Sequence, residues 1–301
     1  MSAAPRVSII VPFLNVAPFL AEAIESVRAQ TYAQWELLLC DDGASDGSTA
    51  IARGYAEREP ERIVYLAHEG GGNRGASEAR NLGLRHARGE IIAFLDGDDV
   101  FLPHKLEQQL AIFDAHPDAD AMYAMTELWY SWSGRPEDAV RDECPSMGVA
   151  SNTLLAHGQL ITGALRREML MPCMCSVLVR ADVARRVGGF VAEFPGMYDD
   201  QVFYTKLSLG ASILFVEQCW DRYRRHPGSM YAAAHGTDVA RRARMHFLTW
   251  LERYLNESGK ASDPALRTAL RAALRRERHP RTFAVVDGAR GLLRGLASLR
   301  R

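Results

Sequence analysis

The sequence lacks any pattern of cysteines that would hold a fold together. Its 301 residues include five cysteines, an odd number, and no two of them form a C-x-x-C pair. A disulfide framework needs paired cysteines, and a structural zinc site needs closely spaced ones. We therefore expect free thiols in a reducing compartment, and neither a disulfide-stapled secreted module nor a zinc-stabilised domain.

Long apolar runs are also missing. No stretch approaches the run of about 18 apolar residues that indicates a membrane-spanning helix. The first six residues lead into a β-branched strand pattern rather than into the apolar region of a signal peptide. We expect a cytoplasmic protein.

The chain has almost no net charge, but its charges are unevenly distributed along the sequence. The formal net charge is −1, yet residues 1–240 carry 21 Lys/Arg against 32 Asp/Glu, whereas residues 241–301 carry 15 against 5. This describes a basic tail on an acidic body. Such a tail can contact phospholipid head groups or nucleic acid, and a solvated helix face is the commoner explanation.

The last residues of the tail have an apolar stripe. It runs from Val286 to Leu299, with arginines beside it. This pattern is compatible with an amphipathic helix at a membrane interface. Glycines within the stripe weaken a helix, so packing on the main domain is the alternative.

Strand and helix patterns alternate through the first hundred residues. Apolar runs at 7–11, 36–40, 63–66 and 91–95 predict four strands, and helical patterns separate them. This alternation is typical of an α/β fold with a parallel, right-handed sheet.

Beyond residue 100 the alternation becomes less regular. Residues 126–170 are rich in Trp, Tyr and Met, and we predict a partly irregular insertion over the mouth of the site there. Further strands are predicted at 119–125, 173–179, 213–216 and 219–225. We therefore expect an α/β domain over residues 1–235 and a helical, basic C-terminal extension over residues 236–301.

Three carboxylates follow the strand at Ile91–Leu95. This run is too short for a buried helix and rich in β-formers, so we predict a central strand. Asp96, Asp98 and Asp99 come directly after it. Like charges this close cannot all stay ionised without a cation between them, which favours a divalent ion. Because ligands of α/β sheets bind beyond the carboxyl ends of the strands, we expect a nucleotide diphosphate with its own metal. A solvated Asp/Gly turn is the alternative.

A glycine-rich segment offers a competing interpretation. Gly70–Gly75 satisfies G-x-G-x-x-G, with Asp96 about 20 residues later, as in an NAD-dependent dehydrogenase. That fingerprint normally occupies the first βα turn, whereas two βα units precede this one. The additional Asp98 and Asp99 would also repel a pyrophosphate, so we disfavour this interpretation.

Four segments occur in an order that is typical of one enzyme family. They are Val7–Asn15, Cys40–Ser48, Asn73–Asn81 and Phe94–Asp99. Together they resemble the signature blocks of family 2 inverting glycosyltransferases with the GT-A fold, strongly over residues 6–115 and more weakly to about residue 230. The resemblance implies a mixed, mostly parallel central sheet flanked by helices. It also implies transfer of a sugar from a nucleotide-sugar donor, expected to be UDP-linked, to an acceptor hydroxyl or amine.

The resemblance assigns a role to particular residues. Those expected to bind the donor are Pro12, Phe13, Asn15, Asp41, Asp42, Arg80, Asp96, Gly97 and Arg224. Asp98, with Asp96 and His226, is expected to hold Mg²⁺ or Mn²⁺. Phe13-Leu14 departs from the family's common pattern, which leaves the identity of the nucleotide open.

Asp200 is the expected general base, with Asp199 as its neighbour, at the start of a helix. A helix N-terminus lowers the pKa of a carboxylate, so we expect base strength to come from desolvation by the incoming acceptor. Simple capping of the helix is the alternative.

The expected partners are the nucleotide-sugar and a saccharide, lipid-linked or small-molecule acceptor, with no nucleic acid. A homodimer and peripheral contact with the inner face of the membrane through the basic C-terminal helices stay open. Two further alternatives are a non-catalytic nucleotide-sugar-binding protein and a nucleotidyltransferase on the same fold. The nucleotidyltransferase is disfavoured because the first βα loop has no Gly/Arg/Lys-rich segment for a triphosphate.

Overall fold

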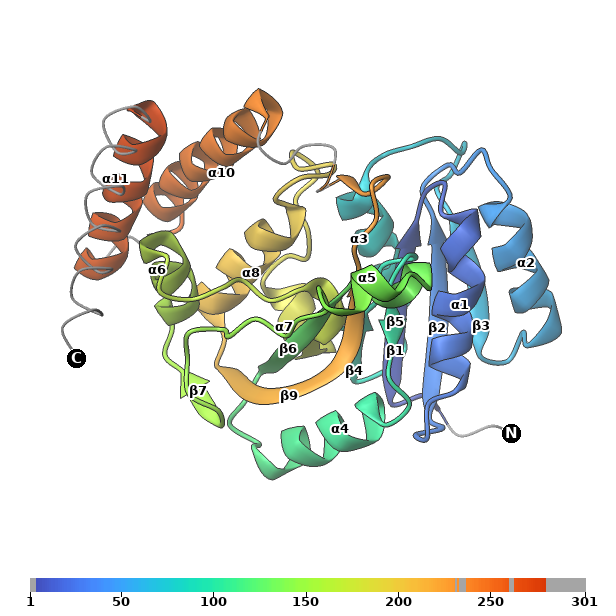
Figure 1. The fold of residues 1–301 in the computed structure, drawn as a ribbon. Helices are drawn as coiled ribbons and strands as arrows, with labels where there is room; N and C mark the ends of the chain where they lie inside the picture. The colour runs from blue at the N-terminus through green and yellow to red at the C-terminus, as the bar shows by residue number, and fades with distance from the viewer. Residues whose placement is uncertain (1–3, 231, 233–236, 260–262, 280–301) are drawn as a thin grey trace. The chain divides into compact units, whose positions relative to one another are not determined.

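The computed structural model describes residues 4–230, 232, 237–259 and 263–279 (Figure 1). Contacts along the chain divide it into two compact units, with the division between His235 and Gly236. The first unit contains a mixed nine-stranded sheet with helices on both faces. The α/β fold with a mixed central sheet and flanking helices is therefore confirmed.

The first four strands form a parallel half-sheet. β1 (Val7–Phe13) pairs in parallel with β2 (Trp35–Asp41) and with β4 (Ile91–Phe94), and β2 pairs in parallel with β3 (Ile63–Ala67). Every residue of β1, β2 and β4 is buried, because these apolar runs are covered on both faces. The carboxyl ends of the three strands consequently lie side by side.

The second half of the sheet is mixed, so parallel pairing does not extend throughout. β8 (Leu178–Arg180) runs antiparallel to β4 and to β6 (Ala121–Trp129), and β9 (Ile213–Arg224) runs parallel to β6. β5 (Val100–Phe101) and β7 (Thr153–Leu155) pair antiparallel with β9. The pairing with β5 brings the end of β9 back to the segment that follows β4.

Helices cover the two faces of the sheet through separate apolar clusters. Because side chains alternate along a strand, Ile9 enters one cluster and Ile10 the other. The first cluster includes residues of α1 (Ala17–Arg28), α2 (Ser48–Arg58) and α4 (Lys105–Ala115). The second includes residues of α3 (Ala76–His86), α6 (Gln159–Arg166), α7 (Ala181–Arg186) and α8 (Asp199–Gly210).

Three local predictions differ from the structure. The strands predicted at 213–216 and 219–225 are one strand, β9. A strand is expected over residues 173–179, but the chain forms a 3-10 turn at Met174–Ser176 followed by β8. Backbone groups of this turn bond to side chains instead of to a neighbouring strand. Gln109 donates to the Ser176 carbonyl, and Tyr204 donates to the Cys173 carbonyl. Residues 126–170 contain more regular structure than expected, namely the end of β6, α5 (Pro136–Ala139), β7 and α6.

The described part of the second unit consists of two helices that pack against each other. They are α10 (Asp238–Glu257) and α11 (Pro264–Arg278), and the side chains of Thr237 and Asp263 cap their first turns. The apolar stripe predicted from Val286 to Leu299 lies outside the described residues. Among the helices that the structure describes, none has both the length and the hydropathy needed to cross a membrane.

A buried ion pair in the first unit offers a test of the packing. Lys105 Nζ lies 2.8 Å from Asp221 Oδ2 with both side chains fully buried, and Thr126 donates to the other carboxylate oxygen. Removal of the ammonium leaves an uncompensated buried charge, so we expect Lys105→Met to lower the free energy of unfolding by about 3–5 kcal/mol in urea denaturation. The exposed Arg186→Gln should change it by less than about 0.5 kcal/mol. Equal effects of the two substitutions would contradict this role of the pair.

Candidate active site

The three carboxylates after β4 have three different environments. Asp96 Oδ1 accepts a hydrogen bond from Arg80 Nη2 at 2.6 Å. Asp98 Oδ2 lies 3.0 Å from His226 Nε2. Asp99 is 1% exposed, and its Oδ1 accepts the backbone N–H of Arg224 at 2.8 Å. The repulsion expected within this cluster is therefore partly relieved by groups of the protein itself.

Asp99 differs from Asp96 and Asp98 in its burial. Burial, followed by the nearby charges of Asp98 and Asp96, raises the pKa of Asp99 well above its usual range. A raised pKa favours the neutral carboxyl group, which is a poorer ligand for a hard cation than a carboxylate. Asp96 and Asp98, the two aspartates predicted to hold the ion, are less buried than Asp99.

Residues Asp96–Asp99 form an acid segment, and Arg80 connects this segment to the start of α8. Its guanidinium donates to Asp96 and, through Nη1, to Asp199. The residue is 5% exposed and lies over the ring of Phe190, 5.4 Å from its centroid. Its Nε is buried and has no hydrogen-bond partner among the described residues. Arg80 thus holds two carboxylates at one edge of the sheet and keeps one donor for a further acceptor.

Asp200 has the environment of a base that works near neutral pH. It is the second residue of α8, which follows Tyr198 in the left-handed conformation at φ 71°. Burial, followed by the charge of Asp199, raises the pKa of Asp200 to about 7. The expectation that the helix N-terminus keeps this pKa low until an acceptor arrives is wrong, because burial outweighs the helix dipole.

Arg224 fastens the end of β9 to the acid segment. Its Nε donates to the backbone carbonyl of Asp98 at 2.7 Å, and its Nη2 donates to Glu22 Oε2 at 2.6 Å. The guanidinium therefore supports the turn that carries Asp98. Three aromatic rings lie within 4.4–5.3 Å of the guanidinium carbon: Phe19, Trp129 and Trp132.

The aspartates after β2 bind loops of the protein. Asp41 Oδ1 accepts the N–H groups of Gly43 and Ala44 at 2.9 and 2.8 Å, and its Oδ2 accepts the hydroxyls of Thr49 and Tyr65 at 2.6 and 2.9 Å. These bonds occupy both oxygens of a buried carboxylate. Asp41 therefore shapes the loop that follows β2.

Asp42 holds the glycine-rich segment in the same way. Its carboxylate accepts the N–H groups of Arg74 at 2.7 Å and of Gly75 at 3.0 Å, and its Oδ1 lies 3.3 Å from His68 Nε2. In a dinucleotide fold such amides bind the pyrophosphate. Here Asp42 occupies them, which argues further against the dehydrogenase interpretation.

The remaining predicted donor residues lie at the end of β1 and close to β4. Asn15 accepts the N–H of Ser45 at 2.7 Å, while Pro12 and Phe13 are buried in the strand. A Cβ at Gly97 would lie only 3.1 Å from the Cβ of Phe13, so a glycine permits the close approach of the two strand ends. The predicted residues thus surround one edge of the sheet.

The acid segment fits a divalent ion that arrives with its ligand. Among the described residues, no group of three or more His, Cys, Asp or Glu forms a ready-made metal site. The 3.0 Å between Asp98 Oδ2 and His226 Nε2 equals the separation of neighbouring ligands on an octahedral ion with bond lengths of about 2.1 Å. Mg²⁺ is commonly held by one or two carboxylates together with substrate phosphates and water, so a ready-made group of three protein ligands is not required.

Two residues of the site carry no signal in the sequence. Phe190 stacks on Phe203 with ring centroids 4.5 Å apart and supports Arg80, and Glu22 pairs with Arg224 across 202 positions of the chain. Neither belongs to a predicted motif. Only the tertiary structure brings them to the site.

Solved structures share this arrangement of strands and helices. Staphylococcus aureus TarS in complex with UDP-GlcNAc has a TM-score of 0.64 at 20% identity, over 92% of this chain and 73% of that one. The mannosyltransferase PcManGT from Pyrobaculum calidifontis, in complex with GDP-Man and Mn²⁺, has a TM-score of 0.58 at 20% identity, over 99% and 81%. The fold is the GT-A fold of glycosyltransferases.

Sequence comparison finds similarity to one enzyme family over part of the chain. Residues 8–128 match the family model described as Glycosyl transferase family 2. A relative from Escherichia coli, UDP-Glc:alpha-D-GlcNAc-diphosphoundecaprenol beta-1,3-glucosyltransferase WfgD, is 42% identical over 106 residues, which are 35% of this chain and 40% of WfgD. The chain spans at most 58% of the length of the first curated relatives that it matches. Over residues 8–128, the chain is therefore similar to glycosyl transferase family 2.

The role of Asp42 in the glycine-rich segment can be measured directly. Loss of hydrogen bonds to a charged acceptor should make the Arg74 and Gly75 amides of Asp42→Ala exchange with deuterium at least about tenfold faster. Glu69→Gln changes an exposed charge in the same segment and should leave these rates unchanged. Equal exchange in wild type and Asp42→Ala would mean that another group holds the segment.

Proposed function

We propose that the protein is an inverting glycosyltransferase that moves a sugar from a nucleotide-sugar donor to an acceptor hydroxyl or amine. The observation that carries this proposal is the position of Arg80 between Asp96 and Asp199. It joins an acid segment suited to a metal-bound diphosphate to a helix that begins with a carboxyl of pKa about 7. Similarity to glycosyl transferase family 2 over residues 8–128 supports the same reaction.

Asp200 is the proposed general base. Its carboxylate accepts the proton of the acceptor O–H or N–H as the acceptor atom forms a bond to the anomeric carbon. The bond between that carbon and the phosphate oxygen breaks on the opposite face, and its electron pair leaves with the nucleoside diphosphate. Attack on one face and departure from the other invert the anomeric centre. Asp199, held by Arg80, keeps the start of α8 in place.

The leaving diphosphate is the proposed ligand of the acid segment. Asp98, Asp96 and His226 would hold Mg²⁺ or Mn²⁺, and the ion when bound offsets negative charge on the diphosphate. The Nε of Arg80, buried without a partner among the described residues, is a suitable donor to a phosphate oxygen. The Mn²⁺ in the PcManGT complex supports a divalent ion at this fold.

UDP is the proposed nucleotide. WfgD carries UDP-Glc in its name and is similar to this chain over 106 residues. TarS, of the same fold, binds UDP-GlcNAc. PcManGT binds GDP-Man, so the fold itself accommodates either nucleotide. The proposal therefore depends on the sequence similarity to WfgD more than on the fold.

The acceptor is proposed to enter beside residues 126–170. These residues include the end of β6, where Trp129 lies close to Arg224. WfgD acts on a sugar linked to diphosphoundecaprenol, which supports a lipid-linked acceptor. Exposed arginines of α10 and α11 suit contact with an anionic membrane surface. They are Arg241, Arg242, Arg253, Arg267, Arg271, Arg275 and Arg278.

The base role predicts a pH dependence. Because Asp200 must be deprotonated, the rate of transfer at saturating donor should rise with pH, reach half its maximum near pH 7 and level off above it. Asp200→Asn should lower transfer by about 10²–10⁴-fold and leave the affinity for UDP unchanged, as measured by calorimetry. Wild-type transfer by this variant, with UDP still bound, would instead indicate a nucleotide-sugar-binding protein without catalysis.

The proposed metal-binding role of Asp98 can be tested by measuring the affinity for UDP with and without Mn²⁺. In wild type, Mn²⁺ should tighten UDP binding at least about tenfold over EDTA, whereas Asp98→Asn should bind UDP equally with Mn²⁺ and with EDTA. Asp182→Asn removes an exposed carboxylate of α7 and should behave as wild type. A full Mn²⁺ effect in Asp98→Asn would refute the role of this carboxylate.

A further inference from the structure

His226 lies shortly after β9, and its ring is enclosed by neighbouring groups. Its side chain is 11% exposed, and its Nε2 is 3.0 Å from Asp98 Oδ2. Two aromatic rings lie beside the imidazole: the ring centroid of Phe19 is 4.8 Å away, and that of Trp132 is 6.3 Å away. A Cβ at Gly228 would lie 3.3 Å from His226 Nδ1, so the backbone of Gly228 comes close to another edge of the ring. These contacts restrict the rotation of the imidazole.

Phe19 and Trp132, which we call the aromatic pair, come from distant parts of the chain. Phe19 is in the first turn of α1, and Trp132 is in the 3-10 helix Ser131–Ser133. Their rings meet edge to face, with centroids 5.5 Å apart and planes at 86°. The rings of Trp132 and His226 also meet edge to face, at 87°. Because edge-to-face contacts at such distances are favourable and directional, the three rings orient one another.

A hydrogen bond fixes the plane of the Trp132 indole. Its Nε1 donates to the carbonyl of Arg225 at 3.0 Å, and the N–H of Arg225 donates to the carbonyl of Trp129 at 3.0 Å. Arg225 is the residue directly before His226. The segment that carries the indole is thus bonded to the backbone that carries the imidazole, through both Trp129 and Trp132.

The turn that leads to Trp132 is ordered by a carboxylate. Asp142 Oδ1 accepts the N–H groups of Tyr130 and Ser131 at 2.6 and 2.9 Å. The hydroxyl of Ser131 in turn accepts Trp129 Nε1–H at 3.1 Å. The indole of Trp132 is therefore placed by bonds within the protein, before any ligand binds.

The second ring nitrogen of His226 lacks the support that metal-binding histidines usually have. Such a histidine commonly donates its other ring N–H to a carboxylate or a backbone carbonyl, and this bond orients the ring. Within the described part of the chain, His226 Nδ1 has no hydrogen-bond partner. The orientation of the imidazole therefore depends on packing, which the aromatic pair provides.

We propose that Phe19 and Trp132 are positioning residues that hold the His226 imidazole in the orientation in which its Nε2 binds a divalent ion beside Asp98. This inference rests on the proposed function, in which Asp98 and His226 hold that ion. Neither aromatic ring has a ligand atom for a hard cation, so both act through His226. Trp132 belongs to residues 126–170, so the segment proposed to lie beside the acceptor also contributes to binding of the ion.

The midpoint of the Mn²⁺ effect on UDP binding tests the proposal. The Kd of the full chain for UDP is measured by calorimetry over a series of Mn²⁺ concentrations, and the midpoint is the concentration that gives half of the tightening. Trp132→Leu and Phe19→Leu should each raise this midpoint about tenfold or more, because loss of the groups that orient a ligand weakens metal binding by such a factor. Each variant should leave the Kd for UDP in EDTA unchanged.

A double variant separates His226 from a second route through Arg224. The guanidinium carbon of Arg224 lies 4.8 Å from the ring centroid of Phe19 and 5.3 Å from that of Trp132, and Arg224 supports the turn of Asp98. If the indole acts through His226, Trp132→Leu adds nothing in the His226→Ala background, and the two midpoints are equal. A further rise of the midpoint in the double variant overturns the proposal.

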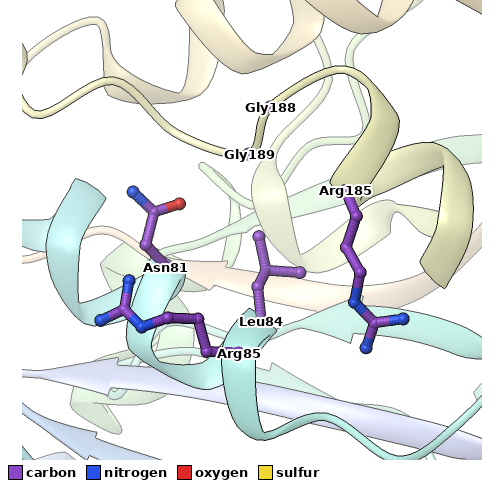
Figure 2. A pocket seen from close by; sticks show the side chains of 6 residues that line it. All are labelled: Asn81, Leu84, Arg85, Arg185, Gly188 and Gly189. Carbon is purple, nitrogen blue, oxygen red and sulfur yellow. The ribbon is translucent and has the colours of Figure 1, made fainter.

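Two control variants remove packing without touching His226. Tyr130→Leu removes the neighbouring aromatic ring of the same turn, which lies 4.0 Å from the guanidinium carbon of Arg141. Leu84→Ala removes packing on the opposite face of the sheet from α1, where Leu84 lines a hollow between α3 and the turn that follows α7 (Figure 2). It should lower the Tm, since it leaves a cavity. Both controls should leave the midpoint unchanged, which separates loss of stability from loss of metal binding.

The outcomes distinguish this proposal from the proposed function. Circular dichroism and the Tm show whether each variant is folded, and Phe19→Leu decides if Trp132→Leu does not fold. A wild-type midpoint in the folded variants overturns the proposal and leaves the proposed function standing. Absence of any Mn²⁺ effect in wild type overturns both, because no ion is then bound beside Asp98.

Discussion

The candidate active site depends on one guanidinium that neutralises carboxylates from two distant parts of the chain. Arg80 bonds to Asp96, which follows the central strand, and to Asp199, which begins α8. Without a cation between them, these acids would repel each other at the same edge of the sheet. The aromatic ring of Phe190 lies beneath Arg80 and restricts where it can move. The end of β4 and the start of α8 are therefore held together by a single buried residue.

The loops around this edge are likewise held by carboxylates of the protein, which accept hydrogen bonds from the loop backbone. The carboxylates of Asp41 and Asp42 bind backbone N–H groups of two neighbouring loops, so these loops are ordered before any ligand binds. A third segment is tied to the start of α3, where Ser77 donates to the carbonyl of Phe194. Such preorganisation lowers the entropic cost of binding a donor, because fewer groups must be ordered at that moment.

Local sequence patterns predicted the parallel half of the sheet well, and the other half less well. β1 to β4 have apolar runs that end at turn residues, and each such run is informative on its own. β8 and β7 have three residues each, and β8 exists because β4 and β6 lie on either side of it. Strands too short to show the two-residue hydrophobic period are therefore determined by pairing with strands that are distant in the sequence. The interpretation of residues 126–170 as partly irregular did not anticipate β7 for the same reason, and it overlooked the amphipathic pattern of α6.

The sequence by itself determined which residues reach the edge of the sheet, because the acids follow directly after strands whose burial their composition dictates. It could not determine what each acid does there. Burial raises the pKa of Asp99 well above its usual range, Asp200 has a pKa of about 7, and Asp41 is occupied by its own loop. These differences arise from desolvation and from partners up to 125 positions away, such as the bond from Arg224 to Asp99. Only the tertiary structure decides them, since the same aspartate side chain changes its chemistry with the groups packed around it.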